Sequence, residues 1–183
     1  MEPVQRLAVP ADAPAIAELM RESVLSLFPA YYDQAQVASA VVHIAGLDLA
    51  LIEDGTYYVH EAGGEIVACG GWSRRNKLFN GSVAGADERL LDPATEPARI
   101  RAMFVRGDWT RRGLGRAILT ACVDAARTAR FTRLALMATL PGVPLYKSFG
   151  FTEVEPAELT MPDGVVLAAV AMERAVDLNG DAR

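Results

Sequence analysis

Cysteine and histidine are scarce in this sequence: its 183 residues contain two of each. Cys69 lies in a strand-like run and Cys122 in a helix-like run, and we read both as small buried hydrophobic residues. With so little sulfur and imidazole, neither a disulfide framework nor a metal site is expected. The sequence also has no convincing Cys–His or Ser–His pair, so a reaction without a covalent enzyme intermediate is favoured.

Long apolar runs and targeting signals are missing too. No run reaches the ~20 apolar residues of a membrane-spanning helix, and residues 1–6 lack the charged-then-apolar order of a secretory signal. We therefore expect a cytoplasmic protein that does not bind membranes. The 51% hydrophobic and 22% charged residues fit one globular domain, placed at residues 4–174 with 175–183 as a C-terminal tail. A homodimer is compatible with the sequence.

Positive charge is in the minority but locally concentrated. The net charge of −5 argues against general nucleic-acid binding. Six arginines nevertheless fall within eighteen residues, and a local positive site on an acidic protein suits a phosphorylated small molecule. Two of the six, Arg99 and Arg101, are expected to be merely solvated. The six are Arg99, Arg101, Arg106, Arg111, Arg112 and Arg116.

Hydrophobic periodicity predicts a mixed α/β sheet of about seven strands flanked by helices. Asp12 is expected to cap the first helix, and Asp33 with Gln36 resembles a capping box for the second. Residues 74–97 read as a long surface loop. The expected strands are 4–9, 56–62, 65–73, 98–105, 134–138, 151–155 and 165–172, and the expected helices are 12–27, 33–44, 114–129 and 141–148.

The stretch most informative about function is Asp-Trp-Thr-Arg-Arg-Gly-Leu-Gly-Arg-Ala at residues 108–117. It lies between a strand-like run and a helical pattern. Gly113 and Gly115 let backbone N–H groups turn inward, and a helix start adds partial positive charge, so the stretch resembles a pyrophosphate receptor. A Walker loop would need a lysine that is absent here, and a dinucleotide fingerprint would need glycine where Ile118 stands. Arginines oppose the dipole at a helix start, so three of them there favour an anionic ligand.

Thirty residues downstream lies Tyr-Lys-Ser-Phe-Gly-Phe at residues 146–151. The order and spacing of the two stretches resemble the GNAT superfamily of N-acetyltransferases. The resemblance implies acetyl-CoA as co-substrate, an amine acceptor, and a V-shaped splay between the strands at 99–105 and 133–139. It implies that the backbone of Met103, Phe104 and Val105 pairs with pantetheine and that Arg111, Arg112, Gly113, Leu114, Gly115 and Arg116 wrap the pyrophosphate. Thr139 would donate a hydrogen bond to the cofactor, and Tyr146 would be the general acid.

The family pattern is not followed everywhere. Thr110 stands where the glycine turn usually begins with glutamine or arginine, and Thr139 stands where asparagine is common. Some members carry a glutamate base on the strand before the turn, but Arg-Ile-Arg occupies residues 99–101 here. The general base therefore stays open among Glu96, His60, Glu61 and a chain of water.

Two further points stay open at this stage. A non-catalytic sensor of acyl-CoA would keep the phosphate turn, and Tyr146 would then only pack against the strand at 133–139. The acceptor is undecided among a small amine or amino-acid-like metabolite, a peptide N-terminus, a protein lysine and an aminoglycoside. Its entrance is expected at residues 28–46 and 74–97, near Tyr31, Tyr32, Asp33, Trp72, Arg74, Arg75 and Phe79.

Overall fold

A computed structural model describes residues 1–77 and 89–179. Seven strands form one open sheet in the order β1-β2-β3-β4-β5-β7-β6, and β4–β5 is its one parallel pair among the described residues. The strands are β1 (Val4–Leu7), β2 (Tyr57–Ala62), β3 (Glu65–Ser73), β4 (Ala98–Val105), β5 (Arg133–Thr139), β6 (Thr152–Thr160) and β7 (Val166–Ala175). The α-helices are α1 (Ala13–Leu27), α2 (Gln34–His43), α3 (Leu49–Glu53), α4 (Leu114–Thr128) and α5 (Val143–Phe149). This confirms the predicted mixed sheet.

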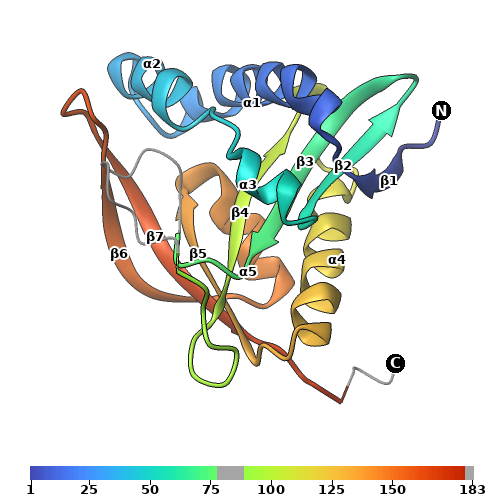
Figure 1. Ribbon diagram of the computed structural model, residues 1–183. Coiled ribbons are helices and arrows are strands. Elements are labelled where there is room, and N and C mark those ends of the chain that lie inside the picture. Colours follow the sequence, from blue (N-terminus) through green and yellow to red (C-terminus); the bar gives the residue numbers. More distant parts are fainter. Residues whose placement is uncertain (78–88, 180–183) are drawn as a thin grey trace.

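Helices cover both faces of the sheet (Figure 1). On one face, α4 and α5 pack on a core that contains Trp72, Phe131 and Tyr146. On the other face, α1, α2 and α3 enclose a second core that contains Met20 and Tyr57. Both cysteines are buried and free, as expected, one in each core.

The N-terminal helices confirm some local signals and correct others. Asp33 caps α2 through the predicted box, because its carboxylate accepts from the Gln36 N–H at 2.9 Å and the Gln36 side chain accepts from the Asp33 N–H at 2.9 Å. Asp12 does not cap α1 with its side chain; its carboxylate accepts from the Val9 N–H at 2.8 Å and pairs with Arg6 at 2.7 Å. The short helix α3 was not predicted.

The C-terminal half extends beyond the predicted limits. β6 continues to Thr160, and β7 reaches Ala175, one residue past the expected domain boundary. Val176 is also buried, and its N–H donates to the Thr132 carbonyl at 2.8 Å. The start of the expected tail is therefore held by the sheet, because pairing with β5 carries the backbone past residue 174. Residues 180–183 lie outside the described chain.

The two parallel strands part soon after they meet. β4 and β5 pair only at Ala98↔Leu134 and Arg99↔Ala135, and their remaining residues are unpaired with each other. β4 also carries a bulge, because Cys69 faces Phe104 whereas Gly71 faces Arg101, so that two residues of β4 oppose Gly70. The predicted splay between the strands at 99–105 and 133–139 is thus present.

Candidate active site

A cleft of about 700 Å³ opens where β4 and β5 part. Its walls come from both cores, so it passes between the two strands from one face of the sheet to the other. We call residues 110–116, before α4, the glycine turn. We call the opposite side the apolar end, which consists of Leu27, Phe28, Tyr31, Ile44 and Leu159.

The glycine turn has the backbone of an anion receptor. Gly113 is the N-cap of α4 with φ of +81°, and Arg111 also has a positive φ of +63°. No heavy atom lies within 4 Å of a Cβ built on Gly113, whereas one built on Gly115 would lie 2.7 Å from the Leu145 Cδ2. Gly113 thus serves the left-handed turn and leaves space open, and Gly115 serves close packing of α4 against α5. No side chain caps α4, and the residues at its start line the cleft, so the N–H groups of its first turn are available to an anion.

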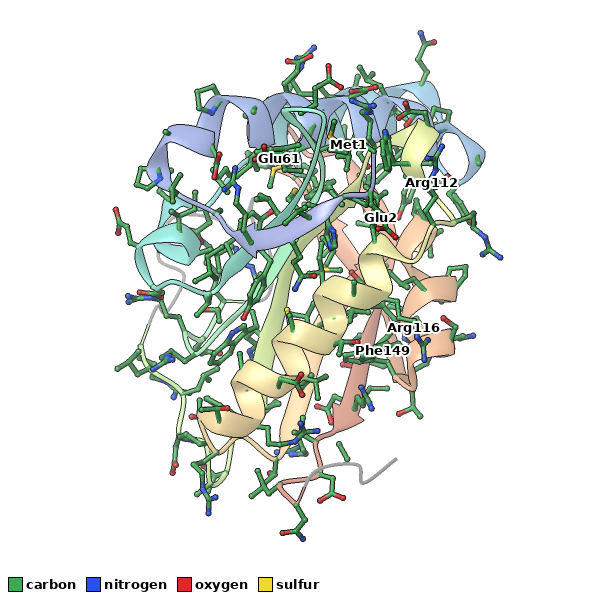
Figure 2. The ribbon with its side chains drawn as sticks, turned by 90° about the vertical axis from the view of Figure 1, so that its right-hand side faces the viewer. Met1, Glu2, Glu61, Arg112, Arg116 and Phe149 are labelled. Carbon is green, nitrogen blue, oxygen red and sulfur yellow. The ribbon has the colours of Figure 1, made fainter. Side chains whose placement is uncertain are left out.

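The three arginines of the turn differ in direction. Arg116 lines the cleft, lies over the Phe149 ring at 5.3 Å and donates to the Ser148 carbonyl at 3.4 Å. Arg111 also lines the cleft. Arg112 instead lies over the Trp109 ring at 4.5 Å and borders a separate hollow beside Met1 and Glu2. Figure 2 shows Arg112 next to the N-terminus and Arg116 beside Phe149.

Every residue expected to contact the cofactor lines the cleft, except Arg112. Met103, Phe104 and Val105 form its β4 wall, and Thr139 lies at the end of β5. Arg112 was grouped with the others because it is their neighbour in sequence. The positive φ of Arg111 and Gly113 turns the chain between them, and this separates the side chains.

Tyr146 lies in the first turn of α5 and is 9% exposed at the cleft wall. Its ring packs edge-on against Phe151, with 5.8 Å between the centroids. Burial raises the pKa of the Tyr146 phenol well above its ordinary value, so the phenol keeps its proton at neutral pH. The geometry therefore combines a packing role with access to the cleft.

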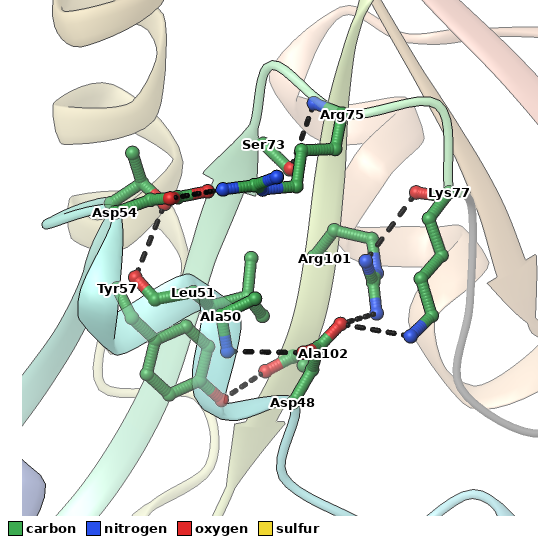
Figure 3. A network of polar contacts seen from close by, with 11 residues as sticks. Asp48, Ala50, Leu51, Asp54, Tyr57, Ser73, Arg75, Lys77, Arg101 and Ala102 are labelled. Carbon is green, nitrogen blue, oxygen red and sulfur yellow. Dashed lines mark hydrogen bonds and ion pairs between the residues drawn. The ribbon is translucent and has the colours of Figure 1, made fainter. Parts of the chain in front are cut away.

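Arg99 and Arg101 are not solvated surface residues, and this sequence-based expectation was wrong. Arg101 is 2% exposed and lines the cleft just beyond the last β4–β5 pair. Its guanidinium pairs with Asp48 at 3.3 Å, and the same Asp48 oxygen accepts from Lys77 at 3.0 Å (Figure 3). Arg99 is half-buried and donates to the Asn76 side chain at 2.9 Å. The acid partner of Arg101 lies about fifty residues earlier in the chain, so local sequence gave no sign of it.

None of the three side chains considered as general base lines the cleft. The Glu96 carboxylate is held by the guanidinium of Arg89 at 2.6 Å and the backbone of Asp92, which lower its pKa to about 2. Glu61 pairs with Arg6 at 2.8 Å. His60 is buried on the α4 side, where burial lowers its pKa, and neither ring nitrogen has a hydrogen-bond partner within the described chain.

The residues expected at the acceptor entrance lie in different places. Tyr31 lines the cleft, but the hydroxyl of Tyr32 donates to the Ala168 carbonyl at 2.7 Å and accepts from the Leu140 N–H at 2.9 Å. Trp72 is buried against Phe131 in the α4-side core, because it points to the opposite face of β3. Asp33 caps α2, Arg74 stacks on Trp72, and Arg75 pairs with Asp54. Phe79 lies outside the described residues.

The comparisons with known proteins agree with this geometry. Residues 16–151 match the acetyltransferase (GNAT) family, a span that contains the glycine turn and Tyr146. The chain belongs to the acetyltransferase (GNAT) family. No curated protein sequence matches this chain significantly. Across the parts of the chain with described coordinates, no helix is long and apolar enough to cross a membrane, and no cluster of three or more His, Cys, Asp or Glu side chains could hold a metal ion.

Solved GNAT structures share the fold over nearly the whole chain. A GCN5-related N-acetyltransferase from Rhodopseudomonas palustris has 18% identity and a TM-score of 0.70, with 96% of each chain covered. The PaiA N-acetyltransferase from Thermoplasma acidophilum, solved with coenzyme A, has 11% identity and a TM-score of 0.64, covering 96% of this chain and 99% of its own. YncA from Salmonella typhimurium, solved with acetyl-CoA, has 19% identity and a TM-score of 0.63, covering 97% and 95%.

Proposed function

We propose that this protein transfers an acetyl group from acetyl-CoA to an amine by direct attack in a ternary complex. One observation carries the proposal: a single cleft joins the glycine turn on one face of the sheet to the apolar end on the other. A long donor with a phosphate-rich end and a reactive end fits such a cleft. Acetyl-CoA supplies the activated acyl group, and the protein supplies position and polar contacts.

The proposed cofactor contacts follow the cleft. The N–H groups of the glycine turn, with Arg111 and Arg116, bind the pyrophosphate. The exposed backbone edge of Met103, Phe104 and Val105 pairs with pantetheine as an added strand would, because β5 leaves that edge unpaired. Thr139 adds a hydrogen bond at the end of β5.

The proposed chemistry requires one proton donor. When the neutral amine attacks the thioester carbon, the C–N bond forms, the C–S bond breaks, and the nitrogen releases a proton to solvent. The leaving thiolate takes a proton from its donor, and the donor regains one from solvent. Tyr146 is placed to supply the thiolate's proton, because its phenol is protonated at neutral pH and borders the cleft. The amine reaches the thioester as the neutral base after losing its proton to water, since the carboxylate and imidazole candidates lie elsewhere.

The charges of the cleft narrow the acceptor class. No aspartate or glutamate is among the lining residues with described positions, so the lining offers no carboxylate to further cationic groups of the acceptor. The apolar end offers aliphatic and aromatic surface to the body of the acceptor. We therefore expect amines that are neutral or acidic elsewhere, such as amino-acid-like metabolites, to be better acceptors than polycationic aminoglycosides.

Thiol release from acetyl-CoA across an amine panel tests the proposal, together with the melting temperature. At acetyl-CoA one hundred times its dissociation constant, binding adds about 2.7 kcal/mol of stability. A melting temperature unchanged by millimolar acetyl-CoA would contradict the proposal. Binding without thiol release on any amine would favour the acyl-CoA sensor. We also expect a cytoplasmic protein, where both buried thiols stay reduced.

A further inference from the structure

The bulge in β4 lies at the point where β4 and β5 have just separated, at the start of the segment proposed to pair with pantetheine. Ala102 has a φ of +50°, which is unusual for a residue other than glycine. Ala102 and Met103 together oppose Gly70 of β3, so the regular ladder is interrupted there. Both residues also line the cleft. A strained backbone position at the wall of a site requires something that holds it.

Tyr57 supplies the contact that holds the bulge. The Tyr57 side chain is 1% exposed, and its hydroxyl donates to the Ala102 carbonyl at 2.7 Å (Figure 3). The tyrosine lies on β2, so the hydrogen bond reaches across β3 to β4. It gives the Ala102 carbonyl a partner at a place where the ladder is broken.

Two glycines in β3 make room for this arrangement. A Cβ on Gly71 would overlap the Thr56 carbonyl and would lie 2.8 Å from the Tyr57 ring. A Cβ on Gly70 would overlap the Met103 sulfur and would lie 3.2 Å from Ile118. Gly71 therefore admits Tyr57 from one side, and Gly70 admits the bulged Met103 from the other.

The hydrogen bond also fixes a donor. The Ala102 carbonyl and the Met103 N–H belong to one peptide unit, and no described peptide bond is cis. In a trans peptide the two groups point in opposite directions. Since the Ala102 carbonyl points to Tyr57, which packs over Gly71 in the core beneath α1–α3, the Met103 N–H points away from Tyr57, and Met103 lines the cleft.

We propose that Tyr57 is a positioning residue that clamps the β4 bulge, so that the Met103 N–H donates to the thioester carbonyl oxygen. Negative charge grows on that oxygen as the amine attacks, and a fixed donor stabilises it. Tyr57 does not touch the substrate and acts through the Ala102–Met103 peptide. This inference rests on the proposed acetyl transfer.

The test compares Tyr57→Phe with Thr56→Val. Tyr57→Phe removes the hydroxyl and keeps the ring. Thr56→Val is the matched control, because it removes a neighbouring buried hydroxyl that donates to a backbone carbonyl, that of Leu51 at 3.3 Å, away from the bulge. We expect Tyr57→Phe to lower kcat about 10-fold, a part of the 10²–10³ lost with a whole oxyanion donor. The KM for acetyl-CoA and the activity of Thr56→Val should change little.

Two ligands separate positioning from general structural damage. One is the ketone analogue of acetyl-CoA, with methylene in place of the thioester sulfur, and the other is S-ethyl-CoA, which has no carbonyl. Tyr57→Phe should reduce the preference for the ketone analogue about 5-fold, the effect of one neutral hydrogen bond. Equal losses for both ligands would overturn the inference. Failure of the wild-type protein to bind either ligand would contradict the proposed function instead.

Amide hydrogen exchange in the wild-type protein gives a second measurement if Tyr57→Phe does not fold. The ketone analogue should slow exchange at the Met103 N–H more than S-ethyl-CoA does. Exchange at Met103 that is the same with both ligands would show that this N–H does not meet the carbonyl, and the inference would be wrong.

Discussion

The two ends of the cleft are built in different ways. The glycine turn is a continuous run of residues 110–116, and its receptor geometry comes from a helix start and two positive φ angles. The apolar end is assembled from α1, the segments after α1 and α2, and β6, which lies far along the sequence from the other three. Under the proposed function, a local motif defines where the donor's phosphates bind, whereas only the folded chain defines where the acceptor binds.

The largest expected effect tests the glycine turn, the end of the cleft that one continuous segment forms. Gly113→Val should weaken acetyl-CoA binding by more than about 100-fold, because a β-branched residue resists the left-handed backbone that directs the N–H groups. Gly164→Val is the control, since Gly164 has a similar φ of +85° in the turn between β6 and β7 and equally open surroundings. Both variants should lose about 1–2 kcal/mol of stability. If calorimetric titration finds the same loss of acetyl-CoA affinity in both variants, Gly113 has no special role in binding and the prediction is wrong.

The next effect tests the middle of the cleft, where the two ends meet. Tyr146→Phe keeps the ring packed on Phe151 and removes the proton, so kcat should fall by about 10²-fold with acetyl-CoA affinity nearly unchanged. Steady-state kinetics on the best acceptor, with Tyr32→Phe as the control, measures this. Tyr32 is suitable because, within the described residues, its hydroxyl hydrogen-bonds to the backbone groups of Ala168 and Leu140. Full turnover by Tyr146→Phe would leave Tyr146 a packing residue.

A smaller effect separates two arginines that the sequence treats alike. Arg116→Ala should weaken CoA about 10-fold, because Arg116 lines the cleft and can meet a phosphate. Arg112→Ala should change affinity by less than about 2-fold, since its guanidinium stacks on Trp109 outside the cleft. Neither variant should alter the binding of acetyl-pantetheine, which lacks the pyrophosphate. Equal losses for the two variants would show that the turn rearranges on binding.

The smallest effect concerns the partly buried ion pairs of Asp48 with Lys77 and Arg101. Burial alone would raise the pKa of Asp48, but Lys77 and Arg101 hold that pKa below its ordinary value. The stability contributed by the carboxylate is therefore complete above about pH 4 and is lost as the pH falls through the lowered pKa. Urea denaturation should give a higher free energy of unfolding for the wild-type protein than for Asp48→Asn at pH 6, and the two values should converge near pH 2. A constant difference would mean that the charge of Asp48 does not matter.

The sequence was most informative where structure is local. The bounds of β4, the glycine turn and the Asp33–Gln36 box follow from neighbouring residues, and the GNAT resemblance placed the splay correctly. Arg101 was misread because its partner Asp48 is brought close only by folding. Arg112 was grouped with Arg116 because the positive φ of Arg111, which helps to turn the chain there, is not signalled by its residue type.

Some features of the site left almost no signal in the sequence. The pair Gly70-Gly71 within a strand was the one local hint of the bulge, since glycine inside a strand often marks a bulge or a close approach. The hydroxyl of Tyr57 and the carbonyl of Ala102 are 45 residues apart. Tyr32 and Trp72 looked available to an acceptor, but their burial depends on packing partners from distant segments.

Hydrogen–deuterium exchange with and without acetyl-CoA tests the central claim most directly, because it reports whether one ligand contacts both the glycine turn and the β4 wall of the cleft. We predict slower exchange at residues 103–105 and 111–116 in the same titration, with no change along β1 or the outer edge of β6. Protection confined to segments outside the cleft, or no protection at saturating acetyl-CoA, would contradict the account.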